Sequence, residues 1–231
     1  LFGAASAALE RQCRRLAVLQ TEMLCVNLGG TVIGSGKGAL PAYQERVLTN
    51  LKARTGLALR YRENLYDAAE YPDDLLTISA AVCAAADVIK KFAGDLRVLS
   101  SGPETGLGEL TVPAIQAGSS FFPGKVNPVL PECVMQCVML MDGNHSILQR
   151  AASGGEMHIN LWEELMGFLL MKNLKMLLAV LPLFTDKCVR GVGIHPKVCE
   201  KKTKSSIPLI VEYKETYGYH RLADRIKKEG L

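Results

Sequence analysis

The sequence predicts an all-α protein, a bundle of long helices followed by the start of a small helical C-terminal domain. Apolar residues recur every three or four positions along several long stretches, a spacing typical of helices buried along one face. No stretch alternates apolar and polar residues as a half-buried strand would, and the chain has no internal repeat. With 231 residues, of which 48% are hydrophobic and 22% charged, we expect a globular chain that buries a sizeable core.

The N-terminal part of the chain predicts two helices joined by a glycine-rich turn. The first helix is expected over 4–26, where the apolar residues fall on one stripe and most charged residues fall elsewhere. The turn runs from Asn27 to Gly38. Pro41 favours the first position of a helix over 41–54, and Gly56 stops it.

A long helix is expected over 67–99, with an irregularity at Tyr71-Pro72. Its alanine-rich centre permits close approach of a neighbouring helix. Residues 100–128 then change in character, because glycines and prolines accumulate and the helical period disappears. Loops of this length inside a compact domain are uncommon and are usually functional.

Helical periodicity returns after this loop, and it predicts a long helix over 129–152, a second over 159–189, a short one from about Pro196 and a last one over 217–230. Gly154-Gly155 separates the two long ones. We expect a central bundle domain over 1–194, which carries the loop, and a partial C-terminal helical domain over 195–231.

Composition argues against several function classes. The net charge of +4 is spread along the chain, and the cluster at Lys201, Lys202 and Lys204 lacks interleaved aromatics, so we expect no nucleic-acid surface. The most apolar stretch, Leu165–Phe184, is interrupted by lysines and a proline. That pattern favours a bundle helix over a membrane span.

The seven cysteines contain no CxxC pair, which is typical of reduced thiols in a cytoplasmic protein. Cys133 and Cys137 lie four positions apart on an expected helix. Because no histidine or cysteine pair lies near them in sequence to complete a metal site, we interpret them as core packing and expect no metal and no cofactor.

The glycines at 34–38 superficially resemble a phosphate-binding loop. A Walker A motif would need glycine at position 31 and serine or threonine at position 38, where this chain has Thr31 and Gly38. A dinucleotide fingerprint fails as well, because no strand precedes the glycines. We therefore expect a turn whose glycines adopt positive φ.

The segment from Gly118 to Asn127 gathers groups suited to an anionic substrate. Ser119 and Ser120 supply hydroxyls beside flexible backbone, and Lys125 and Asn127 supply a charge and an amide. A mobile loop that closes over a carboxylate needs such groups. An ordinary polar turn explains the same composition about equally well, because glycine, serine, proline and asparagine are common turn residues.

The order of these residues distinguishes the two interpretations. The sequence GSSFFPGKVNP at 118–128 resembles the GSSxMPxKxNP signature of the aspartase/fumarase family, which includes argininosuccinate and adenylosuccinate lyases. NLGGTVIGSG at 27–36 is similar to the family's NLGGTAIGTG, and LRVLSSGP at 96–103 to its LRLLSSGP. The similarity continues over 107–116 and weakens after about Ser206.

This resemblance implies anti elimination from a succinyl-type substrate. Ser119 would be the serinate base that removes the Cβ proton, and Lys125 and Asn127, with Ser120, would bind the carboxylate of the resulting aci-carboxylate dianion. Glu132 matches the acidic residue that orients the family's active-site histidine. The family's tetramer implies a homotetramer here, acting on a small dicarboxylate.

NPVLPE at 127–132 is closer to the aspartate ammonia-lyase form, NPVxPE, than to the fumarase form, NPTQCE. L-Aspartate, converted to fumarate and ammonia, is therefore the expected substrate. A fumarase-like enzyme, a lyase of another N-substituted aspartate and an inactive helical scaffold remain as alternatives. Phe122 stands where the signature has methionine, and Glu104 stands where aspartases and fumarases usually have arginine; the second change reverses a charge near the site.

The resemblance also implies parts that this sequence does not contain. A histidine-bearing THxQ-type segment is expected before Leu1, and the C-terminal domain is cut short at Leu231. The chain's own histidines are expected to be surface or packing residues; they are His145, His158, His195 and His220. We therefore expect that these 231 residues alone do not complete a turnover.

Overall fold

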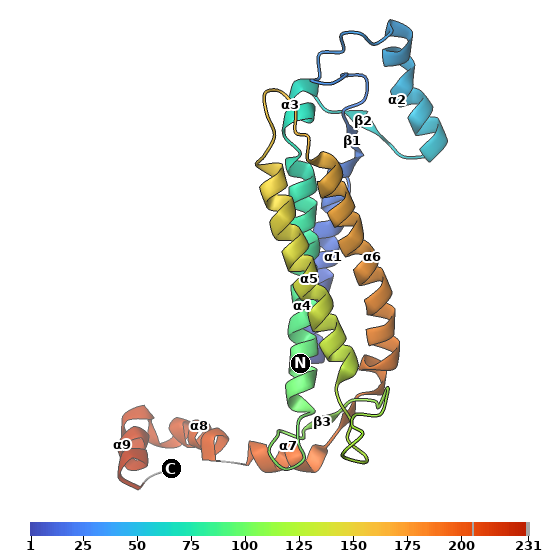
Figure 1. Cartoon of the computed structure of the whole chain (residues 1–231). Coiled ribbons are helices and arrows are strands. Elements are labelled where there is room, and N and C mark those ends of the chain that lie inside the picture. The colour runs from blue at the N-terminus through green and yellow to red at the C-terminus, as the bar shows by residue number, and fades with distance from the viewer. Residues whose placement is uncertain (205, 230–231) are drawn as a thin grey trace. The chain divides into compact units, whose positions relative to one another are not determined.

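A computed structural model describes residues 1–204 and 206–229 of the chain. By their contacts, the residues form two compact units. The first comprises Leu1–Gly94 with Val129–Asp186, and the second comprises Asp95–Pro128 with Lys187–Leu231. Each unit is therefore made from two separate stretches of the polypeptide. Both are mainly helical, which confirms the all-α class and the long-helix bundle (Figure 1).

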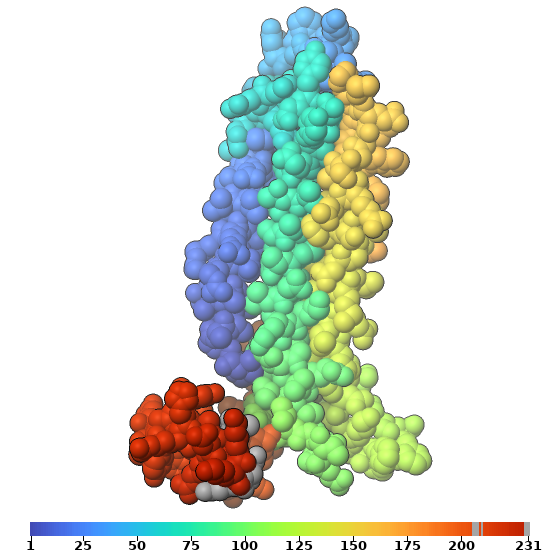
Figure 2. All heavy atoms as spheres, turned by 90° about the vertical axis from the view of Figure 1, so that its left-hand side faces the viewer, coloured from blue at the N-terminus to red at the C-terminus, as the bar shows by residue number. Residues whose placement is uncertain are grey.

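Four long helices form the body of the first unit; they lie side by side in Figure 1, and Figure 2 shows three of them, α1, α4 and α5, from another side. They are α1 (Phe2–Leu19), α4 (Asp73–Leu99), α5 (Val129–Ala152) and α6 (Glu163–Lys187). The shorter elements are a 3-10 turn at Glu22–Leu24, β1 (Cys25–Val26), α2 (Pro41–Thr55), β2 (Arg60–Tyr61) and α3 (Leu65–Glu70). The strands β1 and β2 pair in parallel over two residues each.

Edge-to-face contacts between phenylalanine rings connect three of the long helices. The ring of Phe92 on α4 meets Phe2 of α1 at 5.3 Å between centroids and Phe184 of α6 at 6.1 Å, both edge-to-face. This geometry places the positive edge of one ring on the negative face of the next, which stabilises the contact beyond the apolar area that it buries. Phe92 therefore links α1, α4 and α6.

Polar side chains inside the bundle are paired across helices. Ser79 of α4 is fully buried, and its Oγ lies 2.9 Å from Nδ1 of His145 on α5. Asn173 of α6 is 1% exposed; it accepts a hydrogen bond from Asn144 and donates one to the carbonyl of Met141. Since a buried polar group without a partner costs about 1–3 kcal/mol, these pairs fix the register of the helices.

The expected glycine-rich turn adopts positive φ at Gly29, Gly34, Gly36 and Gly38, so the prediction is confirmed. Gly34 has a second requirement, because a Cβ at this position would overlap the Leu65 carbonyl. The turn is a structural connection between α1 and α2.

Helix α6 continues into a 3-10 turn and spans Glu163–Gly191 as one run with a mean hydropathy of 1.6. In the described part of the chain it is the one helix whose length and composition would allow it to cross a membrane. Core helices of globular proteins pass the same test. The residues that α6 buries are Met166, Leu169, Leu170, Asn173, Val180 and Phe184. These residues form the face of α6 that packs inside the bundle, and the rest of its apolar window, of which 33% is buried, stays uncovered.

Asn160 stabilises the connection between α5 and α6 through hydrogen bonds to the backbone on both sides. The residue is 4% exposed; its Nδ2 donates to the carbonyl of Ala151 at 3.0 Å, and its Oδ1 accepts from the N–H of Trp162 at 2.8 Å. We expect Asn160→Ala to lower the free energy of unfolding by about 2–3 kcal/mol, because both backbone partners lose their hydrogen bonds. Urea unfolding measures this change.

Asn50→Ala is the matched control, since Asn50 is an exposed asparagine on α2. We expect it to change the free energy of unfolding by at most about 0.5 kcal/mol. Equal effects of the two substitutions would show that the hydrogen bonds of Asn160 do not stabilise the connection.

The second unit contains the loop and the C-terminal helices. Its strands β3 (Leu110–Thr111) and β4 (Gly193–Ile194) pair antiparallel. A 3-10 turn at Val189–Gly191 precedes β4, and three helices follow it: α7 (Pro196–Thr203), α8 (Ser206–Tyr217) and α9 (Tyr219–Glu229). Lys202 of α7 donates to the carbonyl of Leu107 at 2.7 Å and pairs with Glu109 at 3.0 Å, so α7 is fastened to the segment that leads into the loop.

The observed elements differ from the predicted ones at a few ends. The first helix stops at Leu19 instead of continuing to residue 26, and the irregularity at Tyr71-Pro72 is a complete break between α3 and α4. Helix α8 was not predicted. The two compact units are defined by contacts between residues, and their boundaries differ from those of the expected domains 1–194 and 195–231. The expected domains stay a prediction.

The cysteine pair of α5 does not lie in the core. Cys133 is exposed and Cys137 is half-buried, so the sequence-based interpretation of this pair as core packing is wrong. The physical reason is helical phase. Val134 and Val138 follow the two cysteines by one position each and are fully buried, and a rotation of about 100° per residue turns the cysteines away from the core.

Candidate active site

The neck of the signature loop is closed by hydrogen bonds between its two ends. The N–H of Gly118 donates to the carbonyl of Lys125 at 3.1 Å, and Nδ2 of Asn127 donates to the carbonyl of Gly118 at 2.8 Å. A Cβ at position 118 would overlap the Lys125 carbonyl, so only glycine permits this approach. The loop is therefore a closed ring of backbone with its polar residues in defined positions.

Ser119 is held by the loop's own backbone. Its Oγ accepts hydrogen bonds from the N–H groups of Phe121 and Phe122, both at 3.0 Å. Backbone donors that converge on one oxygen favour its negatively charged form, as they do at an oxyanion hole. The arrangement can thus stabilise an alkoxide at Ser119.

The other polar groups of the loop face solvent. Ser120 and Lys125 are exposed, and among the described residues the ammonium of Lys125 has no hydrogen-bond or ion-pair partner. Phe121 and Phe122 pack edge-to-face on each other at 4.8 Å between centroids, yet they stay 80% and 60% exposed. Lys125 is accordingly free to meet an anion.

One face of the loop borders a hollow of about 700 Å³ within the second unit. Residues of the loop from Phe122 to Val126 line it together with the turn that begins at Ser100. His195 also lines this hollow, in company with Lys125. His195 is exposed, as expected from the sequence, and its position directly after β4, which pairs with β3, brings it beside the loop.

Glu132 lies in the first turn of α5 and is half-buried, so it belongs to the first compact unit and not to the unit of the loop. Glu104, the reversed charge, is exposed and does not line the hollow. Two histidines of the first unit have local partners: His145 meets Ser79, and Nδ1 of His158 lies 3.8 Å from Oε2 of Glu70. Both agree with packing or surface roles.

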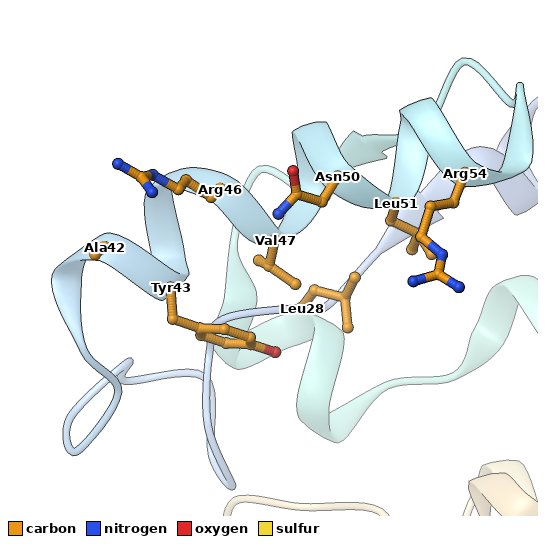
Figure 3. Close-up of a pocket in the computed structure, with 8 residues that line it drawn as sticks. All are labelled: Leu28, Ala42, Tyr43, Arg46, Val47, Asn50, Leu51 and Arg54. Carbon is orange, nitrogen blue, oxygen red and sulfur yellow. The ribbon is translucent and has the colours of Figure 1, made fainter.

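A second hollow, of about 450 Å³, lies between Leu28 and helix α2 in the first unit (Figure 3). Val47 and Leu51 form its apolar wall, and the guanidinium groups of Arg46 and Arg54 stand at its rim. None of the loop's polar groups lines this second hollow. The groups suited to an anionic substrate are on the loop, so the loop is the candidate active site.

A family model described as Lyase matches residues 1–141 of the chain, which include the whole loop and Glu132. The chain belongs to the aspartase/fumarase family of lyases. This membership confirms the resemblance inferred from the three signature segments.

Curated members of the aspartase/fumarase family match along the entire chain. The aspartate ammonia-lyase of Pseudomonas aeruginosa is 35% identical over 231 residues, and that of Bacillus subtilis is 33% identical over 230 residues. Each alignment covers 100% of this chain and 48% of the relative. The chain thus spans about half the length of the curated relatives it matches.

Solved structures of the family share the fold. A fumarate lyase:delta crystallin from Brucella melitensis bound to cobalt superposes with a TM-score of 0.89 at 35% identity, covering 98% of this chain and 49% of that one. A class II fumarase from Schistosoma mansoni gives 0.88 at 26% identity, covering 97% and 50%. The helical bundle is therefore the family's fold.

Proposed function

We propose that the protein is a carbon–nitrogen lyase that converts L-aspartate to fumarate and ammonia by anti elimination. The observation that carries this proposal is the Ser119 hydroxyl, whose oxygen accepts two backbone N–H groups at 3.0 Å. A serine hydroxyl is a poor base in water, so a serine base needs such donors to stabilise its alkoxide. The exposed Lys125 on the same loop adds a positive charge.

The chemistry then follows from the alkoxide. Ser119 takes the Cβ proton of the substrate, and the electron pair moves into the adjacent carboxylate to give an aci-carboxylate dianion. Collapse of the dianion forms the C=C bond and expels the amino group as ammonia. Charge on the carboxylate is greatest near the transition state, so fixed donors at that position lower the barrier most.

Lys125, Asn127 and Ser120 supply those donors in our proposal. The ammonium of Lys125 has three N–H groups, and the Asn127 amide has two, of which one is given to the Gly118 carbonyl. One amide donor of Asn127 is therefore left for the substrate. We further propose that Glu132 orients the active-site histidine that the family signature implies.

L-Aspartate is the preferred substrate because the segment 127–132 has the NPVxPE form, and because the relatives that match along the entire chain are named aspartate ammonia-lyases. The likeness to a class II fumarase supports L-malate as the second candidate. Glu104 is exposed and is not among the residues that line the loop's hollow.

We also propose that the protein assembles as a homotetramer. Large apolar side chains remain exposed along the bundle, among them Leu140 on α5 at 62%, Phe168 on α6 at 64% and Leu178 on α6 at 73%. Large exposed apolar patches on a protein surface usually mark interaction sites. Packing of bundles from several copies against one another would cover it.

The test of the proposed function is an assay of the polypeptide encoded by the whole gene, with fumarate followed by its ultraviolet absorbance. We expect fumarate and ammonia in equal amounts from L-aspartate. Fumarate from L-malate alone would assign the second candidate. A folded tetramer, verified by sedimentation, that releases fumarate from neither substrate would refute the elimination chemistry.

A further inference from the structure

The hollow between Leu28 and helix α2 has no part in the proposed elimination chemistry (Figure 3). Its volume of about 450 Å³ lies within the range of small-molecule sites, about 300–1,000 Å³. Every residue that lines it comes from the stretch 28–54 of the first unit. None belongs to α5 or α6, the helices whose exposed apolar side chains we assign to contacts between copies of the chain.

Hydrogen bonds hold the two walls of this hollow in place. On α2, Nε2 of Gln44 donates to the carbonyl of Gly29 at 3.1 Å and to that of Gly36 at 3.0 Å. The start of α2 is thereby fastened to the turn that follows Leu28. From the opposite side, the hydroxyl of Tyr61 donates to the carbonyl of Gln44 at 3.0 Å. The walls are therefore preformed, and a ligand would not have to order them at an entropic cost.

The floor of the hollow is apolar. The side chains of Leu28, Val47 and Leu51 meet there, and the ring of Tyr43 lies beside them (Figure 3). A methylene chain laid on this floor would remove apolar surface from water on the ligand and on the protein, which is favourable. The floor therefore suits the apolar body of a ligand.

Two positive charges flank this floor. Arg46 and Arg54 stand at the rim, and no acidic residue lines the hollow. Among the described residues, neither guanidinium has a hydrogen-bond or ion-pair partner. The eight positions between them place their Cα atoms about 12 Å apart along the helix axis, and Val47 and Leu51 lie in this interval. Two anionic groups joined by an apolar chain fit this arrangement better than one anionic group does.

We propose that the hollow binds a linear dicarboxylate whose two carboxylates are separated by an apolar chain. One carboxylate pairs with Arg46 and the other with Arg54, while the methylene groups lie on Val47 and Leu51. A guanidinium suits each end because it can donate two parallel N–H bonds to one carboxylate. Decanedioate is the probe, since its extended chain matches the interval of about 12 Å. This site is independent of the proposed elimination chemistry.

The experiment is isothermal titration calorimetry of decanedioate with the polypeptide encoded by the whole gene. Decanoate keeps the chain and loses one carboxylate, whereas butanedioate keeps both carboxylates and loses most of the chain. We expect one decanedioate per chain. It should bind about fivefold more tightly than decanoate, the upper range for one exposed ion pair. It should bind at least about tenfold more tightly than butanedioate, because butanedioate buries little apolar surface.

Arg46→Gln and Arg54→Gln each remove one charge and keep a residue of similar helix propensity. We expect each to weaken the binding of decanedioate by about fivefold, to the level of decanoate. Lys52→Gln is the matched control, because Lys52 is an exposed cation on the same helix and does not line the hollow. This variant should bind decanedioate like the unsubstituted protein. The helical circular dichroism spectrum verifies that all three variants are folded.

Two further measurements need no substitution. Higher ionic strength should weaken decanedioate more than decanoate, because salt screens two exposed ion pairs instead of one. Fumarate, the proposed product, should leave the binding of decanedioate unchanged, since it belongs to the loop.

Several results would overturn the proposal. They are equal affinities of decanedioate and decanoate, a loss in Lys52→Gln as large as in the arginine variants, and displacement of decanedioate by fumarate. No binding of decanedioate by the whole polypeptide would overturn it as well.

Discussion

Ser119→Ala is expected to lower kcat for fumarate formation by about 10³-fold or more, because it removes the proposed base and the oxygen on which two backbone donors converge. KM should change little, since Lys125 and Asn127 keep their donors. The N–H groups of Phe121 and Phe122 lie in an exposed segment, so water replaces the lost acceptor. We therefore expect the free energy of unfolding to change by at most about 1 kcal/mol.

The measurement is a steady-state assay with L-aspartate, together with the helical circular dichroism spectrum. Ser153→Ala serves as the control, because Ser153 is an exposed serine whose hydroxyl makes one hydrogen bond to the carbonyl of Arg150. It should keep full activity. If Ser119→Ala retained more than about a tenth of kcat, which lies outside the usual loss for a removed general base, Ser119 would not be the base.

Much of the fold was predictable because its cues are local. Pro41 and Gly56 set the two ends of α2, and helix α5 has the predicted bounds 129–152. Pro72 lacks an N–H and cannot continue the ladder of α3, so it produces the observed break. Helix α8 was missed because Ile207, Val211 and Thr216 are β-branched and disfavour a helix in isolation. Tertiary contacts with α9 accompany this helix in the structure.

The candidate site was predictable only in part. The family signature identified Ser119, Lys125 and Asn127 from the sequence. It also implied that hydrogen-bond donors stabilise the alkoxide of Ser119. The pattern could not tell which donors these are, because that depends on φ and ψ within the loop. Nor could it bring His195 to the loop, since this placement depends on the pairing of β3 with β4, two strands far apart in sequence.

Gly118→Ala is expected to lower activity by about 100-fold, although it touches no reacting group. The new methyl group would overlap the Lys125 carbonyl, and it lies against the backbone N of Asn127 as well. The neck of the loop must then open. This opening separates the Gly118 N–H from the Lys125 carbonyl and the Asn127 amide from the Gly118 carbonyl. Since a displacement of about 1 Å at a reacting group costs about 100-fold in rate, we expect kcat/KM to fall by about that factor.

Gly124→Ala is the matched control within the same loop. Gly124 has a positive φ, +80°, which Gly118 lacks, and a Cβ there meets no atom within 4 Å. Its substitution costs only the backbone strain of a left-handed residue, about 1 kcal/mol, and should lower kcat/KM by less than about tenfold. Steady-state kinetics on both variants separates the two effects. Equal losses in the two variants would mean that the overlap at position 118 disturbs the loop no more than the backbone strain at position 124 does, and would contradict the closed neck. A greater loss at position 118 is the result that the closed neck requires, because only there does the added methyl group push apart the two ends that hold Ser119 in place.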